Sequence, residues 1–239
     1  DNDRPRANAA WYAWGLDKLE QNTHECGIYK KDDDYVTLFC DLSLGARAKE
    51  PVMRVKEYIT VSNDGSVSFE FEAERAEKCD ELPRFGLSIV MPRGNERVEY
   101  FGMGPYEAYA DHKYQSHIGY FRTTATDNFE HYIRPQENGT KTDIRWWKLI
   151  NAGGIGLQFR ADAPFSASAL NYTIESLDNG NEKNQRHSQE VKPTDFTNFC
   201  IDKVQMGLGC VNSWGRLPLE QYRIPYQDYE FSFIMMPIK

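Results

Sequence analysis

The 239-residue sequence has no apolar run long enough to cross a bilayer, and it has little positive charge. A membrane-spanning helix needs about 20 consecutive apolar residues, whereas one of the longest apolar stretches here is Phe231–Ile238. There are 28 Lys and Arg residues against 36 Asp and Glu residues, which gives a formal net charge of −8. Affinity for nucleic acid rests mainly on Lys and Arg at the phosphates. We therefore expect no nucleic-acid partner and no membrane partner.

Cysteine is too sparse and too scattered for a disulfide framework or a zinc site. No two cysteines form a CxxC motif, and their odd number leaves at least one thiol unpaired in a monomer. We expect buried or incidental thiols, and the count slightly favours a reducing compartment. The compartment stays open on this basis, with the cytoplasm favoured slightly over the periplasm. The five positions are Cys26, Cys40, Cys79, Cys200 and Cys210.

The sequence also lacks an initiating methionine and a basic, apolar leader, because it begins at Asp1. We expect an excised domain or a processed product. The composition is 40% hydrophobic and 13% aromatic, enough to bury a substantial core, so the chain is not a solvated coil.

Helical periodicity is nearly absent, and the alternation typical of strands replaces it. The best helix candidate is Ala9–Leu19, although Gly15 weakens the pattern. Residues 52–73 predict a hairpin that turns at Asn63-Asp64-Gly65. Further strands are expected at Tyr35–Leu42, Phe85–Met91, Ile155–Ala161, Phe196–Asp202 and Tyr229–Met236.

Strands without intervening helices predict an all-β fold, a large antiparallel sandwich. The polar stretch Asp178–Lys192 reads as a long loop, because strand patterns resume after it. We therefore expect residues 1–239 to form a single domain.

Catalytic motifs are missing: there is no GxSxG elbow, P-loop, GxGxxG helix start or HExxH. His112, His117 and His131 fit separate histidines better than a metal cluster, so we expect no metal site. A glycosidase needs two facing carboxylates. Glu107 and Asp111 cluster behind a Gly-Pro turn, where a role in fixing the loop is favoured over catalysis.

Aromatic residues near turns are the more informative candidates, because a flat ring suits the apolar face of a sugar. Trp146 and Trp147 are adjacent and would face opposite sides of a strand, so at least one of them belongs to the core. Trp214 follows a Gly-rich stretch and precedes Gly215, which favours an exposed aromatic tip.

Four ordered motifs resemble one family. Gly104-Pro105-Tyr106-Glu107-Ala108-Tyr109-Ala110-Asp111, followed by Lys113, resembles the G-P-x-E-x-Y-x-D-x-K stretch in the C-terminal sandwich domain of family-two beta-galactosidases. Tyr132-Ile133-Arg134-Pro135-Gln136-Glu137-Asn138-Gly139, followed by Asp143, Arg145 and Trp146, is the stronger match. Gln205-Met206-Gly207-Leu208-Gly209 leading to Ser213-Trp214-Gly215, and the opening Asp1-Asn2-Asp3-Arg4, complete the set.

The resemblance implies a β-sandwich related to the sugar-mutarotase fold, attached behind a (β/α)8 barrel that carries both catalytic glutamates. Such a barrel takes typically about 250 residues and does not fit here. The chain alone should therefore be inactive, with no catalytic residue and no cofactor of its own. By the resemblance, a divalent cation belongs to the catalytic domain, the substrate is a galactoside, the partners are the barrel and the other domains of the same chain, and the full-length enzyme is a homo-oligomer.

The resemblance also assigns roles to individual residues. Trp214 corresponds to the aromatic residue that lines the aglycone side of the galactoside pocket. Glu107, Asp111, Glu137 and Arg145 carry over as motif residues that hold loops and strands together. Cys210-Val211-Asn212 departs from the family, in which many relatives have a glycine and one or two acids.

Two alternatives remain. A mutarotase-like enzyme would need a histidine acid and a carboxylate base, and His187 is the histidine in a late polar loop. A galactose-binding lectin would need a preformed sugar site, which the exposed aromatics allow.

Overall fold

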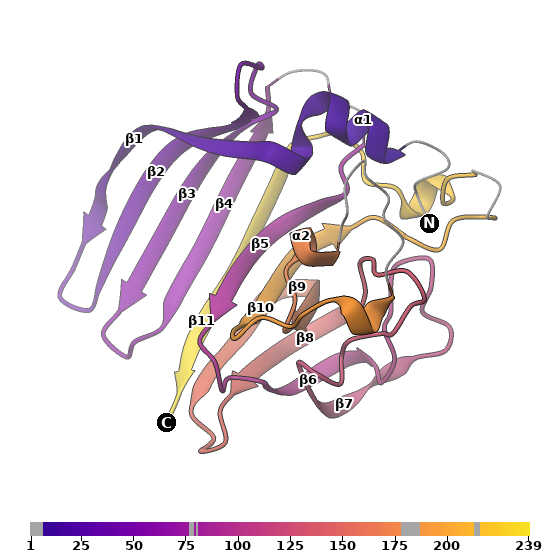
Figure 1. The fold of residues 1–239 in the computed structure, drawn as a ribbon. Coiled ribbons are helices and arrows are strands. Elements are labelled where there is room, and N and C mark those ends of the chain that lie inside the picture. The colour runs from indigo at the N-terminus through magenta and orange to yellow at the C-terminus, as the bar shows by residue number, and fades with distance from the viewer. Residues whose placement is uncertain (1–6, 77–78, 80, 178–186, 213–215) are drawn as a thin grey trace.

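The computed structural model describes residues 7–76, 79, 81–177, 187–212 and 216–239. Strands dominate these residues, and the paired strands run antiparallel throughout (Figure 1). This confirms the all-β, antiparallel fold class. The strands are β1 (Leu19–Lys31), β2 (Tyr35–Ala46), β3 (Met53–Ser62), β4 (Val67–Arg75), β5 (Arg84–Met91), β6 (Arg97–Gly104), β7 (His117–Thr124), β8 (Lys141–Ile150), β9 (Gly156–Leu170), β10 (Thr197–Gln205) and β11 (Tyr229–Ile238).

The helical elements are short and lie outside the sheet. They are the α-helices α1 (Ala7–Trp14) and α2 (Ile174–Leu177) and the 3-10 turns η1 (Leu16–Lys18), η3 (Ser188–Glu190) and η4 (Glu220–Tyr222). Among the described residues, no helix has the length and apolar character to span a membrane.

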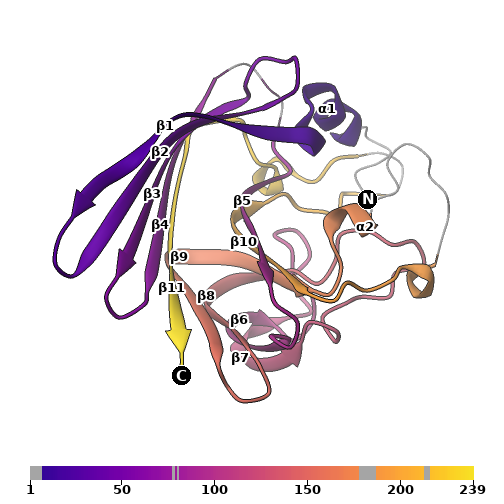
Figure 2. The ribbon, with the colours of Figure 1, turned by 60° about the vertical axis from the view of Figure 1, so that its left-hand side comes forward.

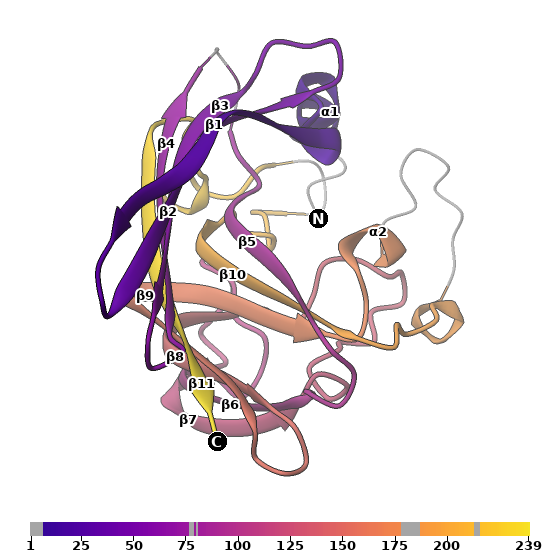
Figure 3. The same ribbon diagram turned by 90° about the vertical axis from the view of Figure 1, so that its left-hand side faces the viewer.

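The long strand β9 connects two layers. The main path of the sheet runs β1-β2-β3-β4-β11-β9-β8-β6-β7. Residues 156–161 of β9 pair with β11, whereas residues 166–170 pair with β10, which in turn pairs with β5. Figure 2 and Figure 3 show β5 and β10 lying on one side of the curved sheet of β1–β4 and β11.

The main core lies where these layers meet. Trp147 of β8 is fully buried, and its ring stacks on that of Tyr100 at a centroid distance of 5.0 Å. Phe199 of β10 packs on Phe159 of β9 at 4.5 Å. Strands distant in sequence therefore share one apolar interior, the dominant source of stability.

The predicted hairpin over residues 52–73 is confirmed by β3 and β4, which are joined at a turn where Gly65 has φ of +84°. The five other predicted strands correspond to β2, β5, β9, β10 and β11, several of which are longer than expected.

The predicted helix Ala9–Leu19 is wrong at its C-terminal end. The helix α1 ends at Trp14, because Gly15 adopts a left-handed φ of +77°, and β1 begins at Leu19. The alternation rule missed β1 because every one of its residues is exposed, so neither face of this edge strand carries an apolar pattern.

The expectation of incidental thiols is wrong for two cysteines. Cys26 and Cys40 face each other across β1 and β2 and form a disulfide. The antiparallel register of β1 and β2 brings the two cysteines together. Their sequence separation of 14 residues does not by itself predict this disulfide. Cys200 is a buried thiol of β10. In the polar stretch expected to be a loop, residues 178–186 lie outside the described residues.

Candidate functional site

Glu107, from the first family-like motif, is buried and held by two donors. It is 3% exposed and accepts hydrogen bonds from the hydroxyl of Tyr132 and from the backbone N–H of Gly139, the latter at 3.0 Å. Burial is the main cause, and the hydrogen bond to Glu107 the second cause, of a pKa of Tyr132 above its ordinary range. A side chain added at Gly139 would lie 2.7 Å from the carbonyl oxygen of Asn128, so this approach requires glycine.

A buried lysine interacts electrostatically with this carboxylate. Lys141 is only 2% exposed, and burial lowers its pKa to about 8, while Glu107 and Glu130 oppose that shift. The negative charge of Glu107 therefore has a cation near it, in addition to its two hydrogen-bond donors.

Asp111 holds the segment that follows β10. Its Oδ2 atom accepts the backbone N–H of Gly209 at 2.9 Å. A Cβ atom at Gly207 would lie 2.5 Å from the Asp111 carboxyl carbon, a distance that real contacts do not reach. The backbone N–H of Gly207 donates to the carbonyl of Tyr222 at 2.9 Å. Glycine at this position thus permits the carboxylate to approach the main chain.

Glu137 ties the second motif to the end of β10. Its Oε1 atom accepts a hydrogen bond from Nε2 of Gln205 at 3.1 Å, and its Oε2 atom lies 3.6 Å from Nη1 of Arg84. Arg84 also makes a two-pronged contact with Asp202, which is 2% exposed, and its Nε donates to Oδ1 at 3.1 Å. Asp202 and Glu137 raise the pKa of Arg84 against the effect of burial. The sequence analysis did not identify Arg84 and Asp202. The available signal was the carboxylate of Asp202 at the end of the apolar strand predicted at Phe196–Asp202, because a carboxylate in such a strand needs a cationic partner.

Arg145 lies apart from this network. Its side chain is exposed, and its Nη1 donates to the carbonyl of Asp143. Asp143 in turn pairs with Lys113 at 3.0 Å.

Trp146 and Trp147 face opposite sides of β8, as their adjacent positions predict. Trp147 is in the core, while Trp146 is half-buried on the other face, with its ring 5.7 Å from that of Tyr120. Trp214, the residue expected to contact sugar, lies outside the described residues.

The histidines take separate positions. His112 is exposed, Nδ1 of His131 lies 3.2 Å from Oγ of Ser188, and His187 caps the turn η3. Across the described ranges, no group of three or more His, Cys, Asp or Glu residues could hold a metal ion.

The three carboxylates of Glu107, Asp111 and Glu137 thus accept hydrogen bonds from the residues 132–139 and 205–209. We call these interactions the loop network. Each of these carboxylates has at least one oxygen that accepts a hydrogen bond from the fold itself. Along the chain, residues 205–209 precede the segment that contains residue 214.

Comparison with known proteins agrees with the motifs. A family model described as "Beta galactosidase small chain" matches residues 1–235. The chain is 30% identical over 233 residues to a beta-galactosidase of Actinobacillus pleuropneumoniae and 31% identical over 233 residues to one of Staphylococcus xylosus. Each match covers 98% of this chain and 22% of the relative, so the chain spans about a fifth of the length of these relatives.

Among solved structures, galactose 1-epimerase from Lactobacillus acidophilus NCFM aligns with 92% of this chain and 66% of its own, at 11% identity and a TM-score of 0.40. The match of the family model over nearly the whole length is the finding that assigns the family. The chain belongs to the beta galactosidase small chain family.

Proposed function

We propose that this chain is a noncatalytic part of a beta-galactosidase that hydrolyses terminal β-galactosides, and that it completes the substrate pocket of a catalytic barrel elsewhere in the same polypeptide. The beta-galactosidase names of the relatives, and the fifth of their length that the chain covers, support this proposal. The chain's own carboxylates in the loop network are engaged in structural hydrogen bonds, which leaves the proton chemistry to the barrel.

One observation carries the proposal: the loop network fixes the segment that leads to Trp214. Asp111 and Glu137 bind the residues 205–209 from two separate loops. Ordering a segment before substrate arrives lowers the entropy lost on binding, so an anchored loop can position a ring against the substrate. In this proposal the indole of Trp214 stacks on the aglycone sugar and orients the scissile bond, without taking part in proton transfer.

The test uses the natural polypeptide that contains these residues. Trp214→Ala should lower kcat/KM for lactose by about 10- to 200-fold, equivalent to about 1–3 kcal/mol, because the ring's apolar contact with the leaving sugar is lost. Trp214→Phe should retain most of the activity, since it keeps a flat ring.

The matched control is Tyr114→Ala, which removes an aromatic side chain that is 95% exposed and should leave the kinetics unchanged. Equal kcat/KM values for Trp214→Ala and the parent would refute the proposal.

A further inference from the structure

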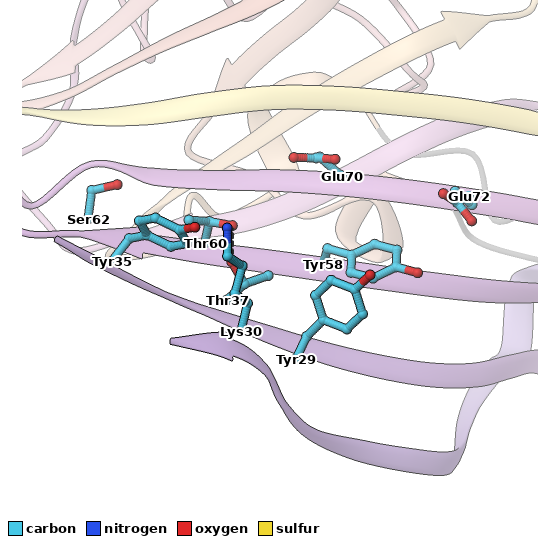
Figure 4. A pocket seen from close by; sticks show the side chains of 9 residues that line it. All are labelled: Tyr29, Lys30, Tyr35, Thr37, Tyr58, Thr60, Ser62, Glu70 and Glu72. Carbon is cyan, nitrogen blue, oxygen red and sulfur yellow. Dashed lines mark hydrogen bonds between the residues drawn. The ribbon is translucent and has the colours of Figure 1, made fainter. Parts of the chain in front are cut away.

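A shallow groove lies on the face of β1–β4 that points away from the core. It is open to solvent and has a volume of about 470 Å³. Figure 4 shows its lining side chains spread over four neighbouring strands, with the ring of Tyr29 next to that of Tyr58. Its lining consists of Tyr29, Lys30, Tyr35, Thr37, Tyr58, Thr60, Ser62, Glu70 and Glu72.

The strand register builds this surface. Thr37 pairs with Thr60, and Tyr58 pairs with Glu70, so polar side chains form rows across the sheet. The hydroxyls of Thr37 and Thr60 lie 2.9 Å apart and fix the floor of the groove. The residues that alternate with these along the strands, such as Val55, point to the other face of the sheet and belong to the apolar core.

An aromatic cluster supplies an apolar platform. The ring of Tyr29 meets that of Tyr58 at 5.2 Å and 72°, and Tyr58 meets Phe39 at 5.2 Å. Tyr29 nevertheless stays 66% exposed. It occupies an irregularity of β1 between Ile28 and Lys30, where the register with β2 shifts. The strand thus holds a tyrosine in place with much of its surface open to solvent.

The polar groups around the rings include both hydrogen-bond donors and hydrogen-bond acceptors. Glu70 and Glu72 are exposed acceptors on β4. Lys30 lies over the ring of Tyr35 with its Nζ 5.0 Å from the centroid, so one end of the groove carries a cation. Because the lining holds one ammonium and two carboxylates, neither a strongly cationic nor a strongly anionic chain is complementary to its whole length. A neutral ligand with many hydroxyls and an apolar ring face matches every part of the lining.

We infer that this groove binds a neutral oligosaccharide chain, with a sugar face on Tyr29 and the sugar hydroxyls on Glu70, Glu72 and the threonine row. The site is separate from the loop network, and it does not depend on the role proposed for Trp214. In a polypeptide that cleaves glycans, it would keep a longer substrate close to the enzyme by a second attachment.

Affinity electrophoresis of the natural polypeptide tests the inference, with soluble β-1,4-galactan in one gel and soluble mixed-linkage β-glucan in another. The parent should be retarded in at least one of these gels. Tyr29→Ala should weaken the affinity about five- to tenfold, because the ring face is lost. Tyr29→Phe should stay within about twofold, since it keeps that face.

Tyr114→Ala is the matched control and should migrate as the parent does. If Tyr29→Ala lowers the melting temperature, the exposed pair Glu70→Ala and Glu72→Ala gives a second measurement of the same loss.

Three results would overturn the inference. The first is migration of the parent that neither polysaccharide alters. The second is equal retardation of the parent, Tyr29→Ala and the Glu70→Ala/Glu72→Ala variant. The third is displacement of bound polysaccharide by a hexalysine peptide at micromolar concentration, which would make the groove a site for cationic peptides.

Discussion

The carboxylate of Asp111 accepts a hydrogen bond from the backbone N–H of Gly209 at 2.9 Å, across 98 positions of sequence. A carboxylate that bonds to a backbone N–H is a strong, directional anchor. Here it joins the loop after β6 to the segment after β10. Through this contact, and through the bond between Gln205 and Glu137, two separate motifs act on one loop.

Gly207→Ala should disturb this anchor directly. Its new Cβ atom would lie 2.5 Å from the Asp111 carboxyl carbon, so one of the two must move. We expect a loss of about 1–3 kcal/mol in the free energy of unfolding, as in other overpacked sites. Amide hydrogen exchange at the residues 205–209 measures it.

Gly27→Ala serves as the control, because a Cβ atom there meets nothing within 4 Å. The same loss for Gly27→Ala as for Gly207→Ala would show that the close approach to Asp111 is not the cause.

Lys141 should make the stability depend on pH. Burial lowers its folded-state pKa to about 8 from 10.5, so the unfolded chain binds more protons between these values. The cost of burying the charge is full below pH 8 and is relieved as the pH rises towards 10.5. Relative to Lys141→Met, the free energy of unfolding of the parent should therefore rise by about 2–4 kcal/mol between pH 7 and pH 10.5.

Denaturant unfolding of both forms across this pH range, with hydrogen exchange at β8 as the local readout, measures the difference. A constant difference between parent and variant would mean that Lys141 titrates normally in the folded state.

The buried pair of Arg84 and Asp202 should be sensitive to the loss of one partner. Arg84→Met leaves the carboxylate of Asp202, which is 2% exposed, without its counter-charge, at a cost of about 3–5 kcal/mol. Replacing both residues, as Arg84→Met with Asp202→Leu, should recover most of this loss in urea unfolding.

The pair of Arg54 and Asp41 is the matched comparison on the surface. Arg54 donates from Nε to Asp41 at 3.0 Å, yet its side chain is 56% exposed. Arg54→Met should cost much less stability than Arg84→Met, because water screens the pair. A cost equal to that of Arg84→Met would contradict the role assigned to burial.

Much of the fold is readable in the sequence where one strand face is apolar and the other polar. The hairpin of β3 and β4 is the clearest case, since its alternation and its turn at Gly65 point to the same structure. β1 was not predictable in this way, because it is exposed at every position and owes its place to pairing with β2.

In the candidate site, too, the sequence predicts some residues and not their partners. Glu107, Asp111 and Glu137 stand in recognisable motifs, so the sequence identifies them. Their partners Gly139, Gly209 and Gln205 come from other segments of the chain, and Gln205 is the last residue of β10. These pairs depend on how the loops meet in three dimensions. The partnership of Cys26 and Cys40 depends in the same way on register, which composition and spacing do not determine.

The most direct test of the account is a double-mutant cycle between Asp111→Ala and Trp214→Ala in the natural polypeptide, measured as kcat/KM for lactose. If Asp111 acts by holding the loop that carries Trp214, Asp111→Ala should lower kcat/KM about 5- to 30-fold in the parent and less than about twofold in the Trp214→Ala background. Losses that simply multiply, with the same factor for Asp111→Ala in both backgrounds, would contradict it.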